Sequence, residues 1–204
     1  MSIRTRNENR ENIHKLVYLA ILTACVIALQ CMASFVFPGA ISINLSLVPI
    51  AIGAAVCGRF AGGWLGLVCG FIVLIDPTTA GFMTFNAWAT VLVVLLKGFL
   101  SGFISGIAYS LLERFNKLLA VAVAAILAPV VNTGIFILGC ILFFAPLFES
   151  VAGGNVVGYV ITAFIGVNLL IEMGLNIVLT PAVHKLISLR TGKETNKSGI
   201  QNQD

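Results

Sequence analysis

The sequence predicts an all-α integral membrane protein, a bundle of six transmembrane helices, and two observations support this fold class. Of the 204 residues, 59% are hydrophobic and only 10% are charged, which leaves too little polar surface for an ordinary soluble domain. Six apolar runs also fill the chain from Leu16 to Ile187. Because a spanning helix needs roughly 20 apolar residues, this length accommodates about six spans and no separate soluble domain.

The apolar runs define the expected elements in order. We expect helices at residues 14–37, 45–58, 60–75, 87–112, 118–144 and 156–187. The second and third are short, and Pro49 lies within the second, so this pair resembles an incomplete hairpin that is tilted or partly re-entrant. We expect residues 1–13 to be a basic cytoplasmic segment, residues 14–190 the membrane domain, and residues 191–204 a disordered cytoplasmic tail.

The basic residues fall on one side of the alternating loops, whereas the opposite loops carry the acids Asp76 and Glu149. Cytoplasmic loops of membrane proteins are enriched in Lys and Arg, so this asymmetry predicts that both termini are cytoplasmic (N-in/C-in). The net charge of +4 then reflects insertion topology and not a nucleic-acid partner. The cations that follow the pattern are Arg4, Arg6, Arg10, Lys15, Arg59, Arg114, Lys117, Lys185, Arg190, Lys193 and Lys197.

Three of the expected helices carry small residues at every fourth position, a spacing that allows helix backbones to approach closely in lipid. We interpret the two glycine series as internal packing of the bundle. The alanine series, on the first helix, fits either internal packing or a docking surface for a separate membrane partner. The three series are Ala20, Ala24 and Ala28; Gly58, Gly62, Gly66 and Gly70; and Gly98, Gly102 and Gly106.

Five polar side chains within the apolar runs are candidates for a functional role, because an unpaired ionisable or amide group is costly at membrane depth. They are Lys97, Asn132, Asn168, Glu172 and Asn176. The last three are spaced by four residues, so they share one helix face, which we expect to face the bundle interior. Lys97 and Glu172 could pair with each other as a structural contact, or both could contact a solute.

Two further candidates come from the outer segment between residues 76 and 88, which mixes turn formers, aromatics and hydrogen-bonding groups. Asn86 and Trp88 could help to close over a ligand. Trp88 could equally be an interfacial anchor, a common role of tryptophan in membrane proteins.

Motifs of common enzymes are missing from the sequence. It has no phosphate-binding glycine loop, no H-E-x-x-H and no G-x-S-x-G, and its two histidines, His14 and His184, lie near the ends of the membrane domain. The five cysteines all lie in apolar segments without a metal-binding spacing. We therefore expect no catalytic residue, no cofactor and no metal, and any ATP-driven step would belong to a partner.

Taken in order, these features resemble the substrate-binding S components of energy-coupling-factor (ECF) vitamin transporters. The resemblance covers about residues 14–190. It rests on the basic N-terminus with its alanine-series helix, the segment LSLVPIAIGAAVCG at 45–58, the loop that ends at Asn86, the run LLKG at 95–98 and the asparagine-bearing sixth helix.

The resemblance implies a subunit of a prokaryotic plasma membrane that captures a water-soluble vitamin or precursor from outside. Such subunits associate with a transmembrane coupling subunit and two ATP-hydrolysing subunits. The family docks through the first helix, which corresponds here to Ala20, Ala24 and Ala28, and binds its solute among the later helices and outer loops. The family pocket corresponds here to Asn86, Lys97, Asn132 and Asn168. Trp88 and Glu172 are further candidates for the same pocket, chosen for their places in the outer segment and in the sixth expected helix.

Two other classes stay open at the level of sequence. One is a membrane assembly protein that binds no small molecule. The other is a stand-alone proton-coupled carrier, for which Glu172 would be the proton site.

Overall fold

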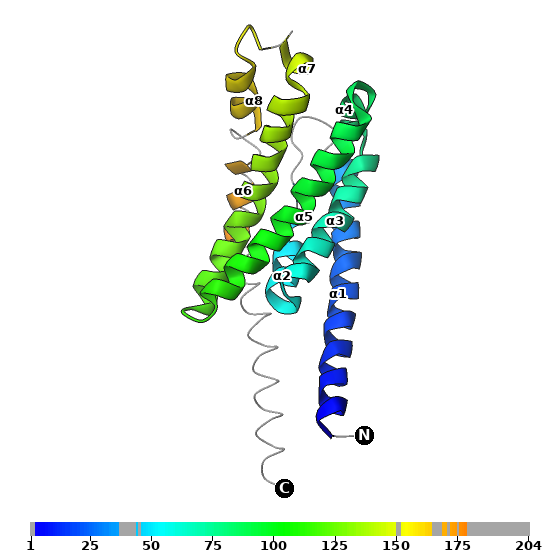
Figure 1. The fold of residues 1–204 in the computed structure, drawn as a ribbon, viewed down its shortest axis with the longest axis vertical. Helices are drawn as coiled ribbons and strands as arrows, with labels where there is room; N and C mark the ends of the chain where they lie inside the picture. The colour runs from blue at the N-terminus through cyan, green and yellow to red at the C-terminus, as the bar shows by residue number, and fades with distance from the viewer. Residues whose placement is uncertain are drawn as a thin grey trace.

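The computed structural model describes residues 3–36, 44, 46–149, 152–164, 169–170, 172–174 and 176–178. Every regular element in these residues is helical, which confirms the all-α class (Figure 1). The elements are α1 (Ile3–Val36), α2 (Leu47–Cys57), α3 (Arg59–Ile75), the 3-10 helix η1 (Pro77–Thr79), α4 (Ala80–Phe85), α5 (Ala87–Leu112), α6 (Lys117–Phe143), α7 (Ala145–Glu149) and α8 (Val156–Phe164). Helical residues also occur at 169–170, 172–174 and 176–178.

The number of membrane spans is confirmed only in part. Within the described residues, three helices are long and apolar enough to cross a bilayer: Asn12–Ser34 of α1, α5 and α6. A fourth span results if α3 and the following η1–α4 segment, which are bent by 73°, count as one. Helix α2 has 11 residues, too few to cross alone. In the sixth expected span, 156–187, residues 165–168, 171, 175 and 179–187 lie outside the described residues, so the count of six stays a prediction.

Element boundaries agree with the sequence in the middle of the chain and differ at two places. Helix α5 coincides with the expected 87–112, and α6 differs from the expected 118–144 by one residue at each end. Helix α1 begins at Ile3, so the basic segment before residue 14 continues the first helix. The expected outer loop is mostly helical, because it contains η1 and α4.

Among the described helices, α3 and α5 share the most extensive contact and lie side by side (Figure 1). A Cβ atom added at Gly66 would collide with the carbonyl oxygen of Gly98, and one at Gly102 would collide with the carbonyl oxygen of Gly62. The backbones therefore touch, as small-residue spacing permits in membrane helices. The interpretation of the glycine series as internal packing is confirmed for these residues.

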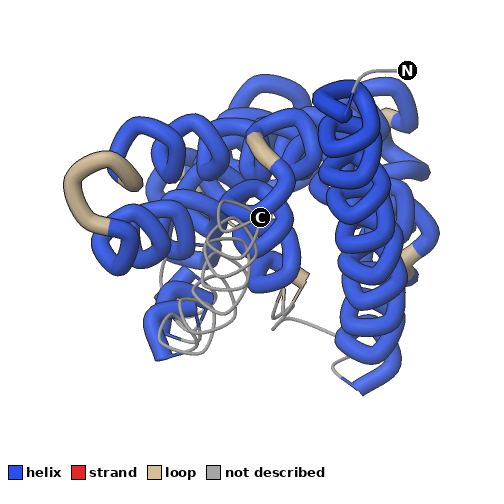
Figure 2. Tube along the Cα trace, turned by 90° about the horizontal axis from the view of Figure 1, so that it is seen from below, coloured by secondary structure: helices blue, strands red, loops and turns tan. Residues whose placement is uncertain are grey.

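Helix α1 packs against α2 and α3 with one face and leaves the other open. Leu22 and Val26 contribute to an apolar cluster with Leu47 and Leu65. Ala20, Ala24 and Ala28 are exposed and face away from this cluster. Figure 2, seen from the end that carries the N-terminus, shows the helix at one edge of the molecule.

The two ends of the helix group differ in their connections. The N-terminus, the α2–α3 turn and the α5–α6 turn lie towards one end, and α4 and α7 lie at the other (Figure 1). The α2–α3 turn is made at Gly58, whose φ of 99° lies in the region that favours glycine. The expected break between the second and third helices is therefore present.

Helix α6 contains Pro129, which removes one backbone donor from the helix interior. At this level the Ser101 hydroxyl on α5 donates to the carbonyl oxygen of Ala128, at 2.8 Å. This bond joins α5 to α6 beside the proline. Asn132, one turn further along α6, is buried.

Candidate functional site

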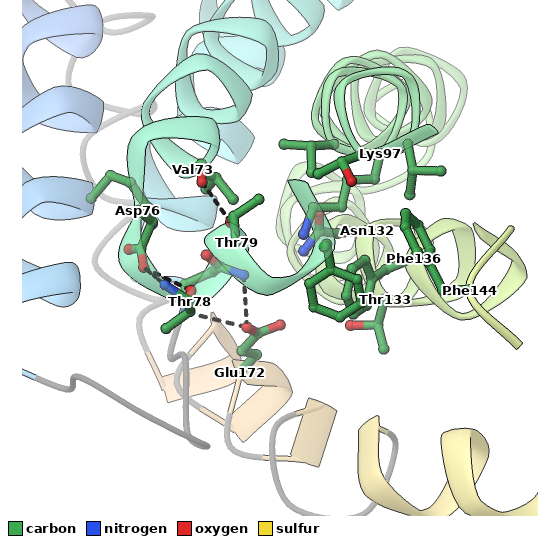
Figure 3. A pocket seen from close by; sticks show the side chains of 16 residues that line it. Val73, Asp76, Thr78, Thr79, Lys97, Asn132, Thr133, Phe136, Phe144 and Glu172 are labelled. Carbon is green, nitrogen blue, oxygen red and sulfur yellow. Dashed lines mark hydrogen bonds between the residues drawn. The ribbon is translucent and has the colours of Figure 1, made fainter. Parts of the chain in front are cut away.

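A cavity of about 200 Å³ is lined in part by η1 and α4, and α4 lies at the end of the molecule away from the N-terminus (Figure 1). Its lining comes from α1, α3, η1, α4, α5 and α6, from Asn44 before α2, and from Glu172 (Figure 3). Three of the predicted site residues, Lys97, Asn132 and Glu172, line this one cavity. Residues that are far apart in the sequence therefore meet in a single polar pocket.

The basic side of the pocket is Lys97 of α5, which lies next to an aromatic wall. The Lys97 Nζ is 4.4 Å from the centroid of the Phe136 ring, a distance that allows a cation–π interaction. Phe82 packs edge-on against Phe136 and Phe144, with centroid distances of 5.7 and 5.1 Å. Asn132 lies beside Lys97 in the same wall (Figure 3).

The acidic side is Glu172, of which only 4% is exposed. Its Oε1 accepts two hydrogen bonds from Asn44, one from the backbone N–H at 3.2 Å and one from Nδ2 at 3.1 Å. Its Oε2 is buried and has no hydrogen-bond partner in the described part of the chain. Within that part, Lys97 and Glu172 form no ion pair, so the purely structural pairing left open by the sequence does not occur there.

The sequence predicts that the helix face of Asn168, Glu172 and Asn176 points into the bundle, and this is confirmed for the two residues of the three that the structure describes. Glu172 and Asn176 are both buried, at 4% exposure each, so this face points into the bundle. Asn176 borders a smaller void near Val48 and Val121. Asn168 lies outside the described residues.

A second carboxylate, Asp76, lies at the turn between α3 and η1 and is fully engaged with nearby groups. It accepts hydrogen bonds from the Thr78 backbone N–H at 2.9 Å and from the Thr78 hydroxyl at 2.7 Å, and the Ser34 hydroxyl of α1 donates to it as well. Partial burial raises the pKa of Asp76, but the hydrogen bonds from Ser34 and Thr78 outweigh burial and hold that pKa below its usual value. Asp76 therefore shapes the turn and ties it to α1.

Two predicted site residues lie outside the polar pocket. The Asn86 side chain caps α5 by accepting a hydrogen bond from the Ala89 backbone N–H at 3.2 Å. Trp88 is 88% exposed. Both border an open apolar groove on the surface of α5, together with Leu92 and Leu96. The structure does not bring them together with Lys97 and Glu172.

Sequence reasoning missed several polar residues that line the pocket, among them Gln30, Asn44 and Thr133. Gln30 is the one amide in the apolar part of the first helix, which is a signal of the same kind as Asn132. Its Oε1 accepts a hydrogen bond from Ser46 at 2.8 Å. Asn44 precedes the second helix and has no periodic pattern that marks it, so only the fold reveals its contact with Glu172.

These features define a multi-pass membrane protein with a polar, solute-sized pocket among its helices. A family model described as "ECF transporter, substrate-specific component" matches residues 14–184, and the chain belongs to this family. No curated protein and no solved structure matches the chain significantly. The resemblance found in the sequence is thereby confirmed, and the protein is a substrate-specific subunit of a transporter and not a member of an enzyme family.

Proposed function

We propose that this protein captures a water-soluble vitamin or related micronutrient in the pocket that contains Lys97, Asn132 and Glu172, and delivers it through an ECF-type ABC importer. The observation that supports this most directly is the Glu172 carboxylate, which is buried at the pocket and has one oxygen without a partner among the described residues. An unpaired polar atom within a membrane domain is costly unless a ligand or water satisfies it. Membership of the ECF substrate-specific family agrees with this reading.

The proposed direction of capture follows from charge. Arg59, Arg114 and Lys117 lie at the α2–α3 and α5–α6 turns, towards the same end as the N-terminus. Under the positive-inside rule this end is cytoplasmic, and the pocket then opens towards the outside of a prokaryotic plasma membrane.

The proposed partners are a transmembrane coupling subunit and two ATPase subunits. Helix α1 offers the docking surface, because Ala20, Ala24 and Ala28 form an exposed line of small side chains. Such a line lets another helix approach closely. The contacts of α1 with α2 and α3 use its other face, so docking would not disturb the pocket walls.

The two other classes predict different behaviour of the purified protein. A membrane assembly protein would bind no solute. A proton-coupled carrier would transport without ATP and would respond to pH through Glu172. The substrate-capture subunit binds solute alone but accumulates it only with an ATPase.

The decisive experiment is mass spectrometry of small molecules that remain bound through purification in detergent. Intrinsic fluorescence is a poor substitute, because Trp64 and Trp88 are 52% and 88% exposed and neither lines the pocket. We expect a stoichiometric micronutrient in the wild type and its loss in a Lys97→Ala, Asn132→Ala double variant. The matched control is Asn116→Ala, since Asn116 caps α6 away from the pocket. A protein that carries no solute and whose melting temperature no vitamin shifts would contradict the proposal.

A further inference from the structure

We infer that the solute is a small organic acid that is recognised at two points: its anionic group by Lys97 and Asn132, and an O–H or N–H donor by Glu172. The inference rests on the proposed function and narrows the class of substrate. It rests on two groups in the pocket wall, the Glu172 carboxylate and the Lys97 ammonium group, whose hydrogen-bonding capacity is not used by the described residues.

The first step concerns Glu172. Its Oε1 is saturated by two bonds from Asn44, which fix the orientation of the carboxylate. Its Oε2 is buried and has no partner in the described residues. The oxygens of an ionised carboxylate only accept hydrogen bonds, so the partner of Oε2 in ionised Glu172 is a donor. A hydroxyl, amide N–H or amine on the solute provides it.

The second step concerns Lys97. Its ammonium group lies over one ring, Phe136, and has no carboxylate partner among the described residues. The nearest alternative acid in the pocket lining, Asp76, already accepts hydrogen bonds from Thr78 and Ser34. An ammonium group has three donors and no acceptor, so an anionic group on the solute is the complementary partner.

The third step concerns the arrangement of the two charged residues. Lys97 projects from α5, and Glu172 enters from the opposite side of the pocket (Figure 3). They form no ion pair in the described part of the structure. A solute that lies between them can therefore contact both, whereas two directly paired residues would leave no polar site.

The fourth step sets the size of the solute. The cavity has a volume of about 200 Å³, below the roughly 300–1,000 Å³ of most small-molecule sites. This volume favours a compact solute, such as one with a single ring or a short branched chain. Phe82, Phe136 and Phe144 supply an apolar wall for the carbon skeleton. The predicted class is a compact hydroxy- or amide-bearing carboxylic acid.

The test compares acids with neutral analogues of the same skeleton. The probes are pantothenate and pantothenol, and biotin and biotinamide, with riboflavin and pyridoxine as neutral vitamins; any compound that copurifies is identified and added. Binding is measured by calorimetry and by the shift in melting temperature. We expect one acid to bind at least tenfold more tightly than its neutral partner.

Two variants assign the two recognition points. In Lys97→Met, which removes the charge and keeps the length of the chain, the acid should lose its advantage over the neutral partner. In Glu172→Gln, which replaces an acceptor oxygen by a donor, affinity should fall at least tenfold while the preference for the acid remains. If a variant fails to fold, the affinities of the wild-type protein for the acid and for its neutral analogue still test the inference.

The outcomes separate the two proposals. Tight binding of riboflavin or pyridoxine, or equal binding of an acid and its neutral partner, would overturn the two-point recognition and leave the capture function intact. A protein that binds none of the probes and copurifies with no small molecule would overturn the capture function, and the inference with it.

Discussion

At the scale of single residues, Asn44 determines how the acidic side of the pocket is presented. Its backbone N–H and its side-chain N–H both donate hydrogen bonds to the same oxygen of Glu172. Hydrogen bonds to an ionised group are stronger than those between neutral groups. Asn44 is therefore a positioning residue, because it holds the carboxylate in the orientation that leaves Oε2 available to a ligand.

We predict that Asn44→Ala weakens solute binding by about tenfold, since the loss of one hydrogen bond to a charged group costs roughly 1.5–3 kcal/mol and 1.4 kcal/mol is a factor of ten. The measurement is the dissociation constant of the copurifying solute by calorimetry. Asn116→Ala is the matched control: it removes the α6 cap, formed with Leu118 and Leu119, and should lower thermal stability without changing affinity. Equal affinities in wild type and Asn44→Ala would remove the positioning role.

The residue scale also shows which site members a sequence can reveal. Lys97, Asn132 and Glu172 are conspicuous, because a charged or amide side chain is expensive in an apolar run. Asn44 lies outside such a run, so nothing in the sequence marks it. The sequence points to Asn86 because it lies in a polar segment, but that segment folds into η1 and α4, and the Asn86 side chain caps α5.

At the scale of elements, the contact between α3 and α5 depends on glycine on both sides. The contact also bounds the pocket, since Val73 at the end of α3 and Lys97 on α5 both line it. A side chain between the two backbones would separate the helices and widen this wall.

We predict that Gly66→Ala destabilises the protein by about 1–3 kcal/mol, because the added methyl group collides with the Gly98 carbonyl oxygen and forces a backbone shift. Gly134→Ala is the control, since a Cβ there meets no atom within 4 Å. That variant should be neutral or slightly stabilising, as alanine is the better helix former. Both are measured by thermal unfolding in detergent, and equal melting temperatures would contradict close α3–α5 packing.

The open face of α1 gives the second prediction at this scale. Ala24→Trp should abolish ATP-dependent uptake in cells that supply an ECF module, yet leave solute affinity unchanged, because Ala24 is exposed and away from the pocket. Leu138→Trp, on the exposed side of α6, is the control and should transport normally. Loss of both transport and affinity in Ala24→Trp would mean that the alanine series belongs to the fold.

Element boundaries were predictable where local chemistry defines them. Helix α5 begins after Asn86 and α6 after Asn116, and both asparagines are side-chain caps that follow polar segments. The start of α1 was not predictable from hydropathy, because charged residues do not exclude a helix that extends beyond the membrane.

At the scale of the whole molecule, charge asymmetry predicts the orientation. We predict that alkaline phosphatase fused after Arg114 is inactive and the same enzyme fused after Gly153 is active, because that enzyme folds only outside the cytoplasm. A fluorescent protein fused to residue 204 should fluoresce, as expected for a cytoplasmic C-terminus. The reverse pattern would turn the pocket towards the cytoplasm and contradict capture from outside.

At the scale of the whole molecule, the sequence predicted the fold class well and the arrangement of the pocket residues poorly. Composition and apolar runs are properties of the chain as a whole, so the all-α membrane class followed from them, whereas the family followed from the order of motifs along the chain. The pocket depends on which faces of several helices meet. No local pattern specifies that Asn44 contacts Glu172.

The contact between Asn44 and Glu172 joins positions 128 residues apart, and this separation has a consequence for biosynthesis. A ribosome that adds about 5–20 residues per second needs roughly 6–26 seconds to cover that distance. Lys97 and Asn132 are made during this interval, before the carboxylate that completes their pocket exists. Each newly made molecule therefore spends several seconds with polar groups in the bilayer and no finished binding site, and the speed of translation sets how long.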